Sequence, residues 1–462
     1  MKVNRRIIIL LCFVSLLFLS QIGYLSYWTI FRASKVASMT YNKRNWVNNN
    51  KILRGGIYDR VGTPLATSTI DEKKKQARTY LFPKSYAHII GYNSQIYAQT
   101  GLENSYNDLL SGKDPISKTV NLIASQPKGA DLTISIDNEL QQTAYKAMSD
   151  KVGSLVALNP YTGEILAMVS TPSFDINEEE LTQNWNKYAE DEDKPFFSRA
   201  TNGLYQPGST FKTITGTSYL ENIGMPPKYD DTGSSIIGNK EFKNYGGHRY
   251  GIVNFYNAFA KSSNTAFATW GSALGGDKLR ATAEKFGFNK SYKFDIPLSV
   301  SKFPNKAMSL PDIAASSIGQ WKVQATPLEM AKIAGIVANG GYDISPYLVQ
   351  YATASNGTIA YQHIMLNEKK VMTDYSNKRM KTAMEDVVKY GTGSGARVAG
   401  IQIAGKTGTA ENEVPGKEHA WFIGYAPADN PKIAFAIIHE YSGNAGSSLA
   451  SVVNKIVAEY LK

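Results

Sequence analysis

The chain has 462 residues, of which 43% are hydrophobic and 19% charged, a composition that excludes intrinsic disorder, collagen and small disulfide scaffolds. Lysine and arginine outnumber aspartate and glutamate by 50 to 39, which gives a net charge of +11. Nine basic residues and no acidic residue lie between Met1 and Arg54, so the rest of the chain, with 41 basic and 39 acidic residues, is nearly neutral. We therefore expect no nucleic-acid partner, because such a partner needs a basic patch on the globular part.

An uncharged apolar run extends from Ile7 to Phe31. As a helix it would be roughly 37 Å long at about 1.5 Å per residue, which is enough to cross a bilayer. We interpret residues 7–31 as a transmembrane signal anchor and residues 1–6 as a short cytoplasmic tail. A cleaved signal peptide is the alternative, but the run is long for one and no clear A-x-A cleavage site follows it. Basic residues flank both ends, so the charge count alone does not fix the orientation.

The only cysteine, Cys12, lies inside this apolar run. Thiol nucleophiles, thiolate metal sites and intramolecular disulfides are therefore excluded from the rest of the chain. The five histidines show no metal-ligand spacing, and no phosphate-binding G-x-x-x-x-G-K-[ST] motif occurs. We expect neither a metal nor a cofactor, and we expect ordinary surface or packing roles for the histidines.

Residues 32–130 are too few and too broken by turn signals to form an independent catalytic domain, and we interpret them as a stalk. The sequence RGGIYDRVGTPLA (54–66) predicts turns between short strands. The basic stretch 71–78 predicts a solvated loop or a strand edge. GLENSYNDLLSG (101–112) carries leucine and tyrosine at helical intervals and predicts one short helix.

From residue 131 to residue 462 the patterning is more regular. DLTISI (131–136) alternates like a strand, and Asp137 can cap the helix that follows. SLVALN and GEILAMVS are joined by a turn signal and predict a hairpin. Three more strands are predicted near the end of the chain, followed by a helix, at 401–410, 419–427, 432–440 and 449–461. Because strands from both ends enclose a mainly helical middle, the pattern predicts an α+β domain with an antiparallel sheet covered by helices.

The first motif with candidate chemistry is YQPGSTFK, in which a Pro-Gly pair precedes Ser209 and Lys212 follows three residues later. On a helix this spacing places both side chains on one face. A serine hydroxyl is a poor nucleophile until a base takes its proton, and a desolvated lysine can be that base. S-x-x-K also occurs at Ser125 and Ser299, without a Pro-Gly pair in front, so this motif alone is a weak indication.

Two further motifs follow in order. KSSNTAFA contains Ser262 and Asn264, and GKTGTA lies on a predicted strand. The candidates on that strand are Lys406, Thr407, Gly408 and Thr409. Taken singly, Ser262 could be a helix cap, Asn264 a turn residue and K-T-G-T an edge strand with a glycine bulge. Their order in one chain, behind a membrane anchor, favours a catalytic interpretation.

S-x-x-K, S-x-N and K-T-G in this order resemble the three signatures of the penicillin-recognising serine transferases and hydrolases. Over nearly its whole length the chain resembles a class B penicillin-binding protein. The matching stretches beyond the motifs are 54–66, 101–112, 157–170, 325–341 and 419–427. The resemblance implies a serine β-lactamase/transpeptidase-like fold, with a five-stranded antiparallel sheet and a mainly helical subdomain. The stalk, at about a hundred residues, is shorter than that of many members, so partner contacts of larger stalks are not carried over.

The resemblance implies that Ser209 attacks the carbonyl between the two terminal D-alanines of a peptidoglycan stem peptide, which gives an acyl-enzyme and releases the last D-alanine. Lys212 would be the base for this step. Ser262, helped by Lys406, would relay a proton toward the leaving amine, and Asn264 would hold the substrate backbone. An amine of a neighbouring stem peptide would then accept the acyl group and form a cross-link.

The third motif would hold charge. The resemblance implies that Thr407 and Thr409, with Lys406, bind the terminal carboxylate, and that Gly408 leaves room for the acyl chain. The oxyanion would be held by the backbone N–H groups of Ser209 and Thr409. The implied ligands and partners are stem peptides of lipid II-derived strands, β-lactams and a polytopic glycosyltransferase. The implied location is the bacterial cell membrane, with a single span and an extracytoplasmic catalytic domain.

Other functions share this chemistry. A β-lactamase must activate water, and the segment between Ser262 and Lys406 has no obvious dedicated glutamate loop. A D,D-carboxypeptidase would transfer the acyl group to water, and the stalk favours transpeptidation over both. The segment before the catalytic domain is too short for a glycosyltransferase domain. A β-lactam sensor or a scaffold with little turnover is the alternative from a different class.

Overall fold

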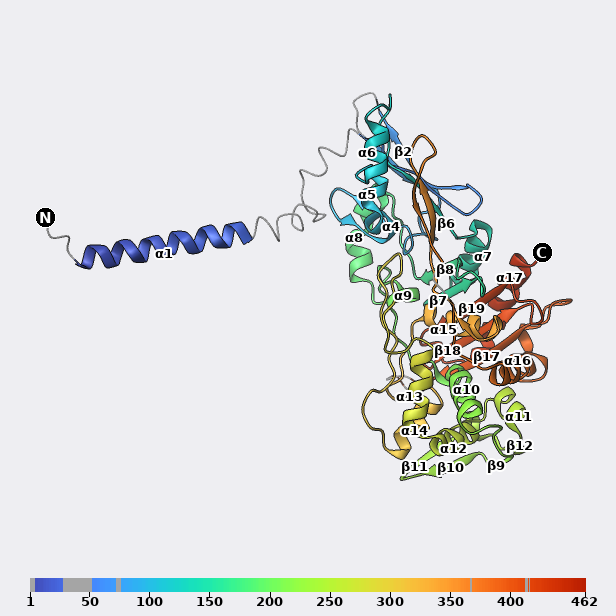
Figure 1. The fold of residues 1–462 in the computed structure, drawn as a ribbon. Helices are drawn as coiled ribbons and strands as arrows, with labels where there is room; N and C mark the ends of the chain where they lie inside the picture. The colour runs from blue at the N-terminus through green and yellow to red at the C-terminus, as the bar shows by residue number, and fades with distance from the viewer. Residues whose placement is uncertain (1–4, 28–51, 72–75, 366–367, 412–413, 415) are drawn as a thin grey trace.

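The computed structural model describes residues 5–27, 52–71, 76–365, 368–411, 414 and 416–462. Figure 1 shows an elongated body. The stalk, with β2 and α6, lies at one end, a five-stranded sheet lies in the middle and a helical subdomain lies at the other end. This arrangement confirms the predicted fold class.

Helix α1 (Arg5–Tyr27) forms most of the predicted anchor. Its segment Arg6–Tyr24 has a mean hydropathy of 2.4 and is long and apolar enough to cross a membrane. Within the described ranges it is the one helix that meets this test. Residues 28–31 of the predicted anchor lie outside the described residues.

The stalk is built on a six-stranded sheet with the order β15-β14-β6-β1-β2-β3. In chain order these strands are Ile57–Tyr58, Pro64–Ile70, Gln76–Tyr80, Asp131–Ile134, Val349–Thr353 and Ile359–Gln362. β1 and β6 pair in parallel, and the other neighbours are antiparallel. The predicted turns between short strands are confirmed at β1 and β2. The sheet combines three strands that precede residue 130 in the sequence with three that follow it, so it crosses the predicted boundary between the stalk and the catalytic domain.

The stalk also contains α6 (Pro115–Asn121), the short pair β4 (Asn93–Ser94) and β5 (Ala98–Gln99), and two helices where one was predicted. These two are α4 (Gly101–Ser105) and α5 (Asn107–Leu110). Tyr106 separates them, because its backbone leaves the helical region at φ −112° and ψ 23°. Its hydroxyl donates to the carboxylate of Asp295, which is 189 positions away, so a tertiary contact replaces the helical continuation.

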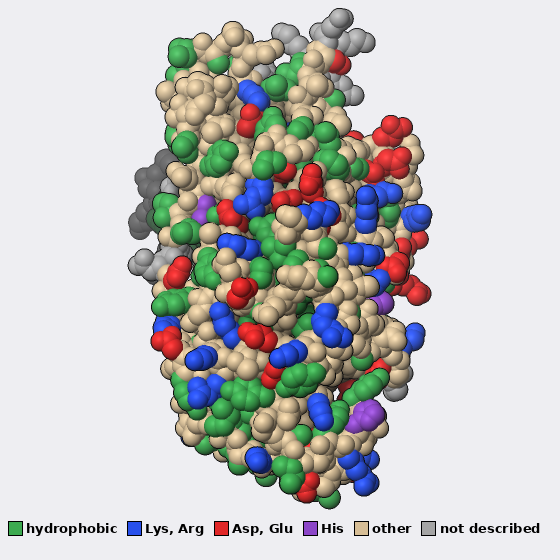
Figure 2. Space-filling view, turned by 90° about the vertical axis from the view of Figure 1, so that its right-hand side faces the viewer, with side chains coloured by type: hydrophobic (Ala, Val, Ile, Leu, Met, Phe, Trp, Pro, Cys, Tyr) green, Lys and Arg blue, Asp and Glu red, His purple; other side chains and the backbone are tan. Residues whose placement is uncertain are grey.

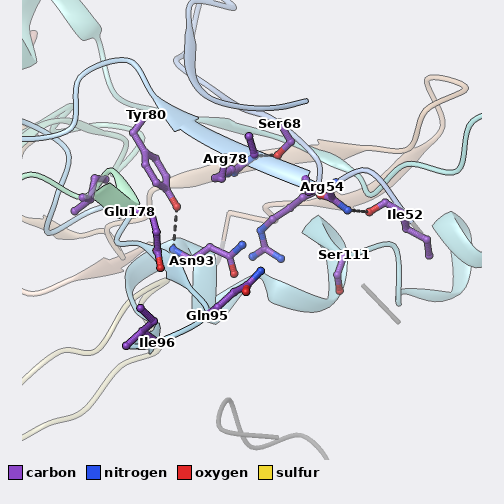
Figure 3. A pocket seen from close by; sticks show the side chains of 13 residues that line it. Ile52, Arg54, Ser68, Arg78, Tyr80, Asn93, Gln95, Ile96, Ser111 and Glu178 are labelled. Atoms are coloured by element: carbon purple, nitrogen blue, oxygen red, sulfur yellow. Dashed lines mark hydrogen bonds between the residues drawn. The ribbon is translucent and has the colours of Figure 1, made fainter. Parts of the chain in front are cut away.

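A buried ionic cluster lies in the stalk. Glu103 is fully buried, with Arg54 Nε 2.6 Å from Oε2 and Arg78 Nη2 2.7 Å from Oε1. Burial alone would raise the pKa of the Glu103 carboxyl, but the two guanidinium groups outweigh it and hold that pKa below its ordinary value. Figure 3 shows Arg54 and Arg78 at a cavity of about 410 Å³, with Asn93 and Gln95 among the other polar groups that line it.

The central sheet has the order β17-β18-β19-β7-β8 and is antiparallel throughout. Its strands are Gly153–Leu158, Ile165–Thr171, Ala404–Ala410, His419–Ala426 and Ile433–His439, in the order β7, β8, β17, β18 and β19. These strands confirm the predicted hairpin and the three predicted C-terminal strands. Strands from the beginning and from the end of the domain form one sheet, because β19, near the C-terminus, pairs with β7.

Helices cover both faces of this sheet. α15 (Pro327–Ala338) packs on one face, and α7 (Asn138–Met148) and α17 (Ala450–Tyr460) pack on the other. Successive residues of a strand point to opposite faces. Along β19, Ala434 and Ala436 accordingly belong to the core under α15, whereas Phe435 and Ile437 belong to the core under α7 and α17. The Asp137 side chain accepts a hydrogen bond from Leu140 N, which confirms the predicted cap of α7.

The helical subdomain follows β8 and a segment with α8 (Glu178–Glu190) and α9 (Arg199–Asn202). Its helices α10 to α14 are Lys212–Asn222, Phe255–Ala260, Asn264–Leu274, Gly276–Lys285 and Leu310–Ser317. Two small strand pairs belong to it, β9 with β12 and β10 with β11, formed by Tyr229–Asp231, Ser234–Ile237, Lys240–Lys243 and Gly251–Val253. α16 (Asp374–Lys389) returns the chain to the edge strand β17.

Figure 2 shows one face of the body, with Lys and Arg side chains interspersed among Asp and Glu side chains. Neither sign of charge forms a continuous patch on this face. The mixture agrees with the nearly neutral composition of the chain after Arg54.

Candidate active site

A cleft of about 760 Å³ lies where the central sheet meets the helical subdomain. Six of the eight residues singled out from the sequence line it: Ser209, Ser262, Asn264, Thr407, Gly408 and Thr409. The other two, Lys212 and Lys406, are fully buried and make hydrogen bonds to residues of the cleft wall. The structure thus brings all eight together, from three segments far apart in the chain.

Ser209 lies in a short 3-10 helix, Gly208–Phe211, that leads directly into α10. In a 3-10 helix, side chains three residues apart eclipse one another, so Ser209 and Lys212 project from the same side of this turn. Gly208 has φ +53°, and a Cβ there would lie 2.5 Å from Thr409 O. A glycine is therefore required where this loop passes against β17.

The Lys212 side chain is anchored on the segment that carries the second motif. Its Nζ donates to Ser262 O at 2.8 Å and to Asn264 Oδ1 at 2.7 Å, and it lies 3.3 Å from Ser262 Oγ. A neutral amine has two N–H donors and one lone pair. Two donors used on two carbonyl oxygens leave the lone pair for a proton, which is the state a general base requires.

Lys406 reaches the same hydroxyl from the sheet. Its Nζ donates to Ser262 Oγ at 2.9 Å and to Thr407 O at 2.9 Å. Ser262 Oγ therefore lies between two lysine amines, one from α10 and one from β17. This placement connects the two lysines through a single hydroxyl, a geometry suited to moving a proton.

Burial lowers the pKa values of both amines. For Lys212, burial is the main cause, the positive charge of Lys406 lowers the pKa further and Asp231 opposes both, so the pKa lies well below its ordinary value. Burial lowers the pKa of Lys406 to about 7. Aromatic rings supply part of the apolar surroundings. The ring centroid of Phe267 lies 5.6 Å from Lys212 Nζ, and that of Phe259 lies 5.5 Å from Lys406 Nζ. Lys406 can therefore exchange a proton near neutral pH, and Lys212 is shifted toward its neutral form.

Ser262 has a left-handed backbone, with φ +59°. The alternative interpretation of Ser262 as a helix cap does not describe the structure, because the next residue, Ser263, caps α12 by accepting from Ala266 N at 3.1 Å. Asn264 is the first residue of α12 and uses its amide oxygen on Lys212 and its amide nitrogen on Lys243 O, 2.9 Å away.

The K-T-G-T strand lies at the edge of the sheet, and β18 is its partner. Thr407 Oγ1 lies 2.5 Å from Thr392 Oγ1. A Cβ on Gly408 would lie 2.9 Å from a methyl carbon of Thr210 and 3.1 Å from Pro207 O, so this glycine allows the Ser209 loop to approach β17. The edge strand therefore lines the cleft with Thr407, Gly408 and Thr409 and packs against the Ser209 loop at the same time.

Three residues of this site have no signal of their own in the sequence: Thr392, Asp231 and Asn244. Thr392 lines the cleft beside Thr407. Asp231 and Asn244 are buried and bond to the segment that carries Ser262. Their residue types are common, and only the tertiary arrangement gives them a place in the site.

Comparisons with known proteins agree with this geometry. A family model described as the penicillin binding protein transpeptidase domain matches residues 153–458, and one described as the penicillin binding protein A dimerisation domain matches residues 54–132. The chain is 34% identical to the peptidoglycan D,D-transpeptidase PbpA of Mycolicibacterium smegmatis, over 92% of this chain and 92% of that protein. It is 31% identical to the peptidoglycan D,D-transpeptidase MrdA of Acinetobacter baumannii, over 84% of this chain and 66% of that protein.

Among solved structures, the chain is similar to penicillin-binding protein A from M. tuberculosis in an imipenem acyl-enzyme complex. The TM-score is 0.84 and the identity 30%, with 90% of this chain and 100% of that chain covered. A D,D-transpeptidase domain from Eggerthella lenta is similar at a TM-score of 0.80 and 31% identity, over 89% of this chain and 98% of that chain. The family model spans well over half of the chain and contains all eight candidate residues, so the chain belongs to the penicillin-binding proteins with a transpeptidase domain.

Proposed function

We propose that this chain is a serine-type peptidoglycan D,D-transpeptidase whose nucleophile is Ser209. The observation that carries the proposal is the position of Ser262 Oγ between Lys212 Nζ and Lys406 Nζ, in the cleft that Ser209 lines. The relatives named D,D-transpeptidases and the imipenem acyl-enzyme structure of a similar protein support the reaction class. Penicillins would acylate the same serine and inhibit the enzyme.

The first half-reaction forms an ester. Ser209 Oγ attacks the carbonyl carbon between the two terminal D-alanines while Lys212 takes the hydroxyl proton. The negative oxygen that develops is held by the backbone N–H groups of Ser209 and Thr409. The C–N bond then breaks, the proton passes through Ser262 with help from Lys406 to the leaving amine, and D-alanine departs.

The second half-reaction reverses this path with a different amine. An amine of a neighbouring stem peptide attacks the ester carbonyl, gives up a proton to the same relay and forms the new amide. The ester C–O bond breaks, and Ser209 recovers its proton. Asn264 positions the donor backbone, and Lys406, Thr407 and Thr409 bind the carboxylate of the leaving D-alanine. No metal or cofactor takes part in this scheme.

Two assays test the proposal. Intact-mass measurement after incubation with a fluorescent penicillin should show one stable adduct on the wild type and none on Ser209→Ala. An adduct that survives Ser209→Ala would refute the nucleophile, and rapid discharge of the wild-type adduct would indicate a β-lactamase. Incubation with a stem pentapeptide and an acceptor amine should give the cross-linked product. Release of D-alanine without a cross-link would instead indicate a D,D-carboxypeptidase, and neither product would indicate a sensor or scaffold.

The apolar helix α1 fits a single-pass membrane protein. We further propose that residues 1–6 are cytoplasmic, 7–31 span the bacterial cell membrane, and 32–130 and 131–462 form an extracytoplasmic stalk and catalytic domain. A polytopic glycosyltransferase would contact the anchor and the stalk. Protease protection in spheroplasts tests the topology, because the catalytic domain should be digested from outside. Co-purification with membrane-embedded glycosyltransferases in detergent tests the partner, and its absence at native expression would refute it.

A further inference from the structure

The turn that carries Ser262 needs support from its surroundings. A left-handed backbone is unfavourable for a serine and persists only where neighbouring groups hold it. In this conformation Ser262 directs its carbonyl oxygen to Lys212 and its hydroxyl to both lysine amines. Whatever holds the turn therefore sets the geometry of the proton relay.

Asp231, the last residue of β9, is 1% exposed and bonds on one side to the cap of α12. Its Oδ2 accepts from Ser263 Oγ at 2.6 Å. Its Oδ1 accepts from Asn244 Nδ2 at 2.7 Å and from Gly233 N at 3.0 Å. Among the described residues Asp231 forms no salt bridge, and three neutral donors stabilise its carboxylate instead.

Asn244 extends this support to the other side of the turn. Its Oδ1 accepts from the backbone N–H groups of Asn264 at 2.8 Å and Thr265 at 3.2 Å, which begin α12. Its Nδ2 donates to Asp231 Oδ1 and to His248 O, the latter at 2.9 Å. Because the oxygen faces two donors and the nitrogen two acceptors, an amide is required here and a carboxylate would meet two acceptors.

We propose that Asp231 and Asn244 are positioning residues that hold the Ser262 turn, through Ser263 and Asn264, so that Ser262 Oγ stays between Lys212 Nζ and Lys406 Nζ. This inference rests on the proposed function, since it gives the relay its geometry. Every polar atom of the Asp231 carboxylate and of the Asn244 amide has a protein partner, and both side chains are buried, which favours a positioning role over substrate contact. The negative charge of Asp231 also raises the Lys212 pKa against the effect of burial. The test therefore needs one variant that removes only the charge and one that removes the contacts as well.

The test uses full-length protein in detergent and measures three quantities with a fluorescent penicillin: the acylation rate constant, the final labelled fraction and the melting temperature. Asp231→Ala should lower the rate constant about 100-fold while the labelled fraction at long times stays near that of the wild type. Asp231→Asn keeps the contacts to Gly233 and Asn244 and can donate to Ser263 Oγ, so its rate should fall no more than about tenfold.

Asn244→Asp is the counterpart with the opposite expectation. It preserves size but faces Asp231 and the His248 carbonyl with an acceptor, so its rate constant should fall about as far as that of Asp231→Ala, about 100-fold. A positioning role predicts this asymmetry between two isosteric changes, whereas a space-filling role would make them equal. Asn339→Ala is the matched control, because Asn339 also bridges two carbonyls, Pro160 O and Tyr342 O, at the far end of α15. Its rate constant should equal that of the wild type.

Three outcomes would overturn the inference: a wild-type rate constant in Asp231→Ala, equal rates in the two isosteres, or a loss of labelled fraction with no change in rate. If Asp231→Ala does not fold, the two isosteres alone decide. Wild-type protein and Ser209→Ala are labelled with the same penicillin as controls. Absence of a Ser209 adduct on the wild type would refute the proposed function, whereas a normal adduct with normal rates in all variants would refute only the positioning role.

Discussion

The stalk and the cleft each bury basic side chains, and their partners decide which protonation state is favoured in each place. In the stalk, Glu103 lies between Arg54 and Arg78, and its pKa is held below the ordinary value, so the charged form is favoured. In the cleft, Lys212 and Lys406 bond to hydroxyl and carbonyl oxygens, and their pKa values are lowered toward the neutral form. A buried base in contact with a carboxylate keeps its charge, whereas one that contacts only hydroxyl and carbonyl oxygens is shifted toward the neutral form, which can accept a proton.

The largest effect expected is on catalysis when Lys212 is removed. Lys212→Met keeps the length of the side chain and removes the proposed base, so acylation by a penicillin should slow by about 10²- to 10⁴-fold. The melting temperature at neutral pH should change little, because the relief from burying the lysine offsets the loss of its hydrogen bonds to Ser262 O and Asn264 Oδ1. Labelling kinetics and thermal unfolding measure the two quantities. A large drop in melting temperature would contradict the comparison.

The reverse pattern is expected in the stalk. Glu103→Gln leaves two buried guanidinium groups without a carboxylate and should lower the free energy of unfolding by about 3–5 kcal/mol. The acylation rate constant of the folded fraction should be unchanged, since the stalk cluster lies outside the cleft. Denaturant unfolding and labelling of the same sample give both values.

The same carboxylate predicts a pH dependence. A lowered pKa in the folded state means that the stabilisation is complete above the pKa of an unfolded glutamate, about 4.3, and is lost as the pH falls through the folded value. Wild-type protein should therefore lose more stability than Glu103→Gln as the pH is lowered from about 5 to about 3. Parallel acid-unfolding curves for the two proteins would contradict this.

A smaller and directional effect is expected from the second lysine. The charge of Lys406 contributes to the lowered pKa of Lys212, so Lys406→Met should raise that pKa. Since the proposed base is the neutral form of Lys212, the rising limb of the acylation rate against pH should move to higher pH in the variant. The residual rate, although reduced, gives the profile. A limb that stays in place or moves to lower pH would show that the two amines are not coupled.

The smallest effect is expected where a lysine pairs with a carboxylate in solvent. Lys370 Nζ lies 2.6 Å from Asp374 Oδ1, but both side chains are exposed. Solvent screens such a pair, so Lys370→Ala should leave the melting temperature and the acylation rate unchanged within error. A clear loss of stability here would mean that burial is not what separates the stalk cluster from other ion pairs.

Local patterns in the sequence were enough to predict much of the catalytic domain. The three C-terminal strands and the helix after them were predicted from their apolar residues. The structure confirms β17 to β19, which are buried on both faces, and α17, which buries one face. The three motifs could also be recognised from local spacing. In S-x-x-K, for example, a single helical turn places the serine and the lysine side by side.

Contacts between distant segments were not predictable in this way. Asp231 meets Ser263 across 32 positions, and Thr392 meets Thr407 across 15, and nothing in either residue type indicates the partner. The single helix predicted at 101–112 is two helices in the structure for a similar reason, because Tyr106 between them donates a hydrogen bond to the distant Asp295. In each case a tertiary contact that local propensity does not encode determines the outcome.

The six-stranded sheet has a consequence for the order in which the molecule can form. β6 receives β14 from beyond α15, and Ser135 Oγ bonds to Tyr347 O across 212 positions. Such closure is entropically costly and slow compared with local pairing. β6 can pair with β1 early, but its other edge stays unpaired until β14 (349–353) has been made. A protein released with its C-terminal third missing would lack part of the stalk, although the stalk lies at the other end of the sequence.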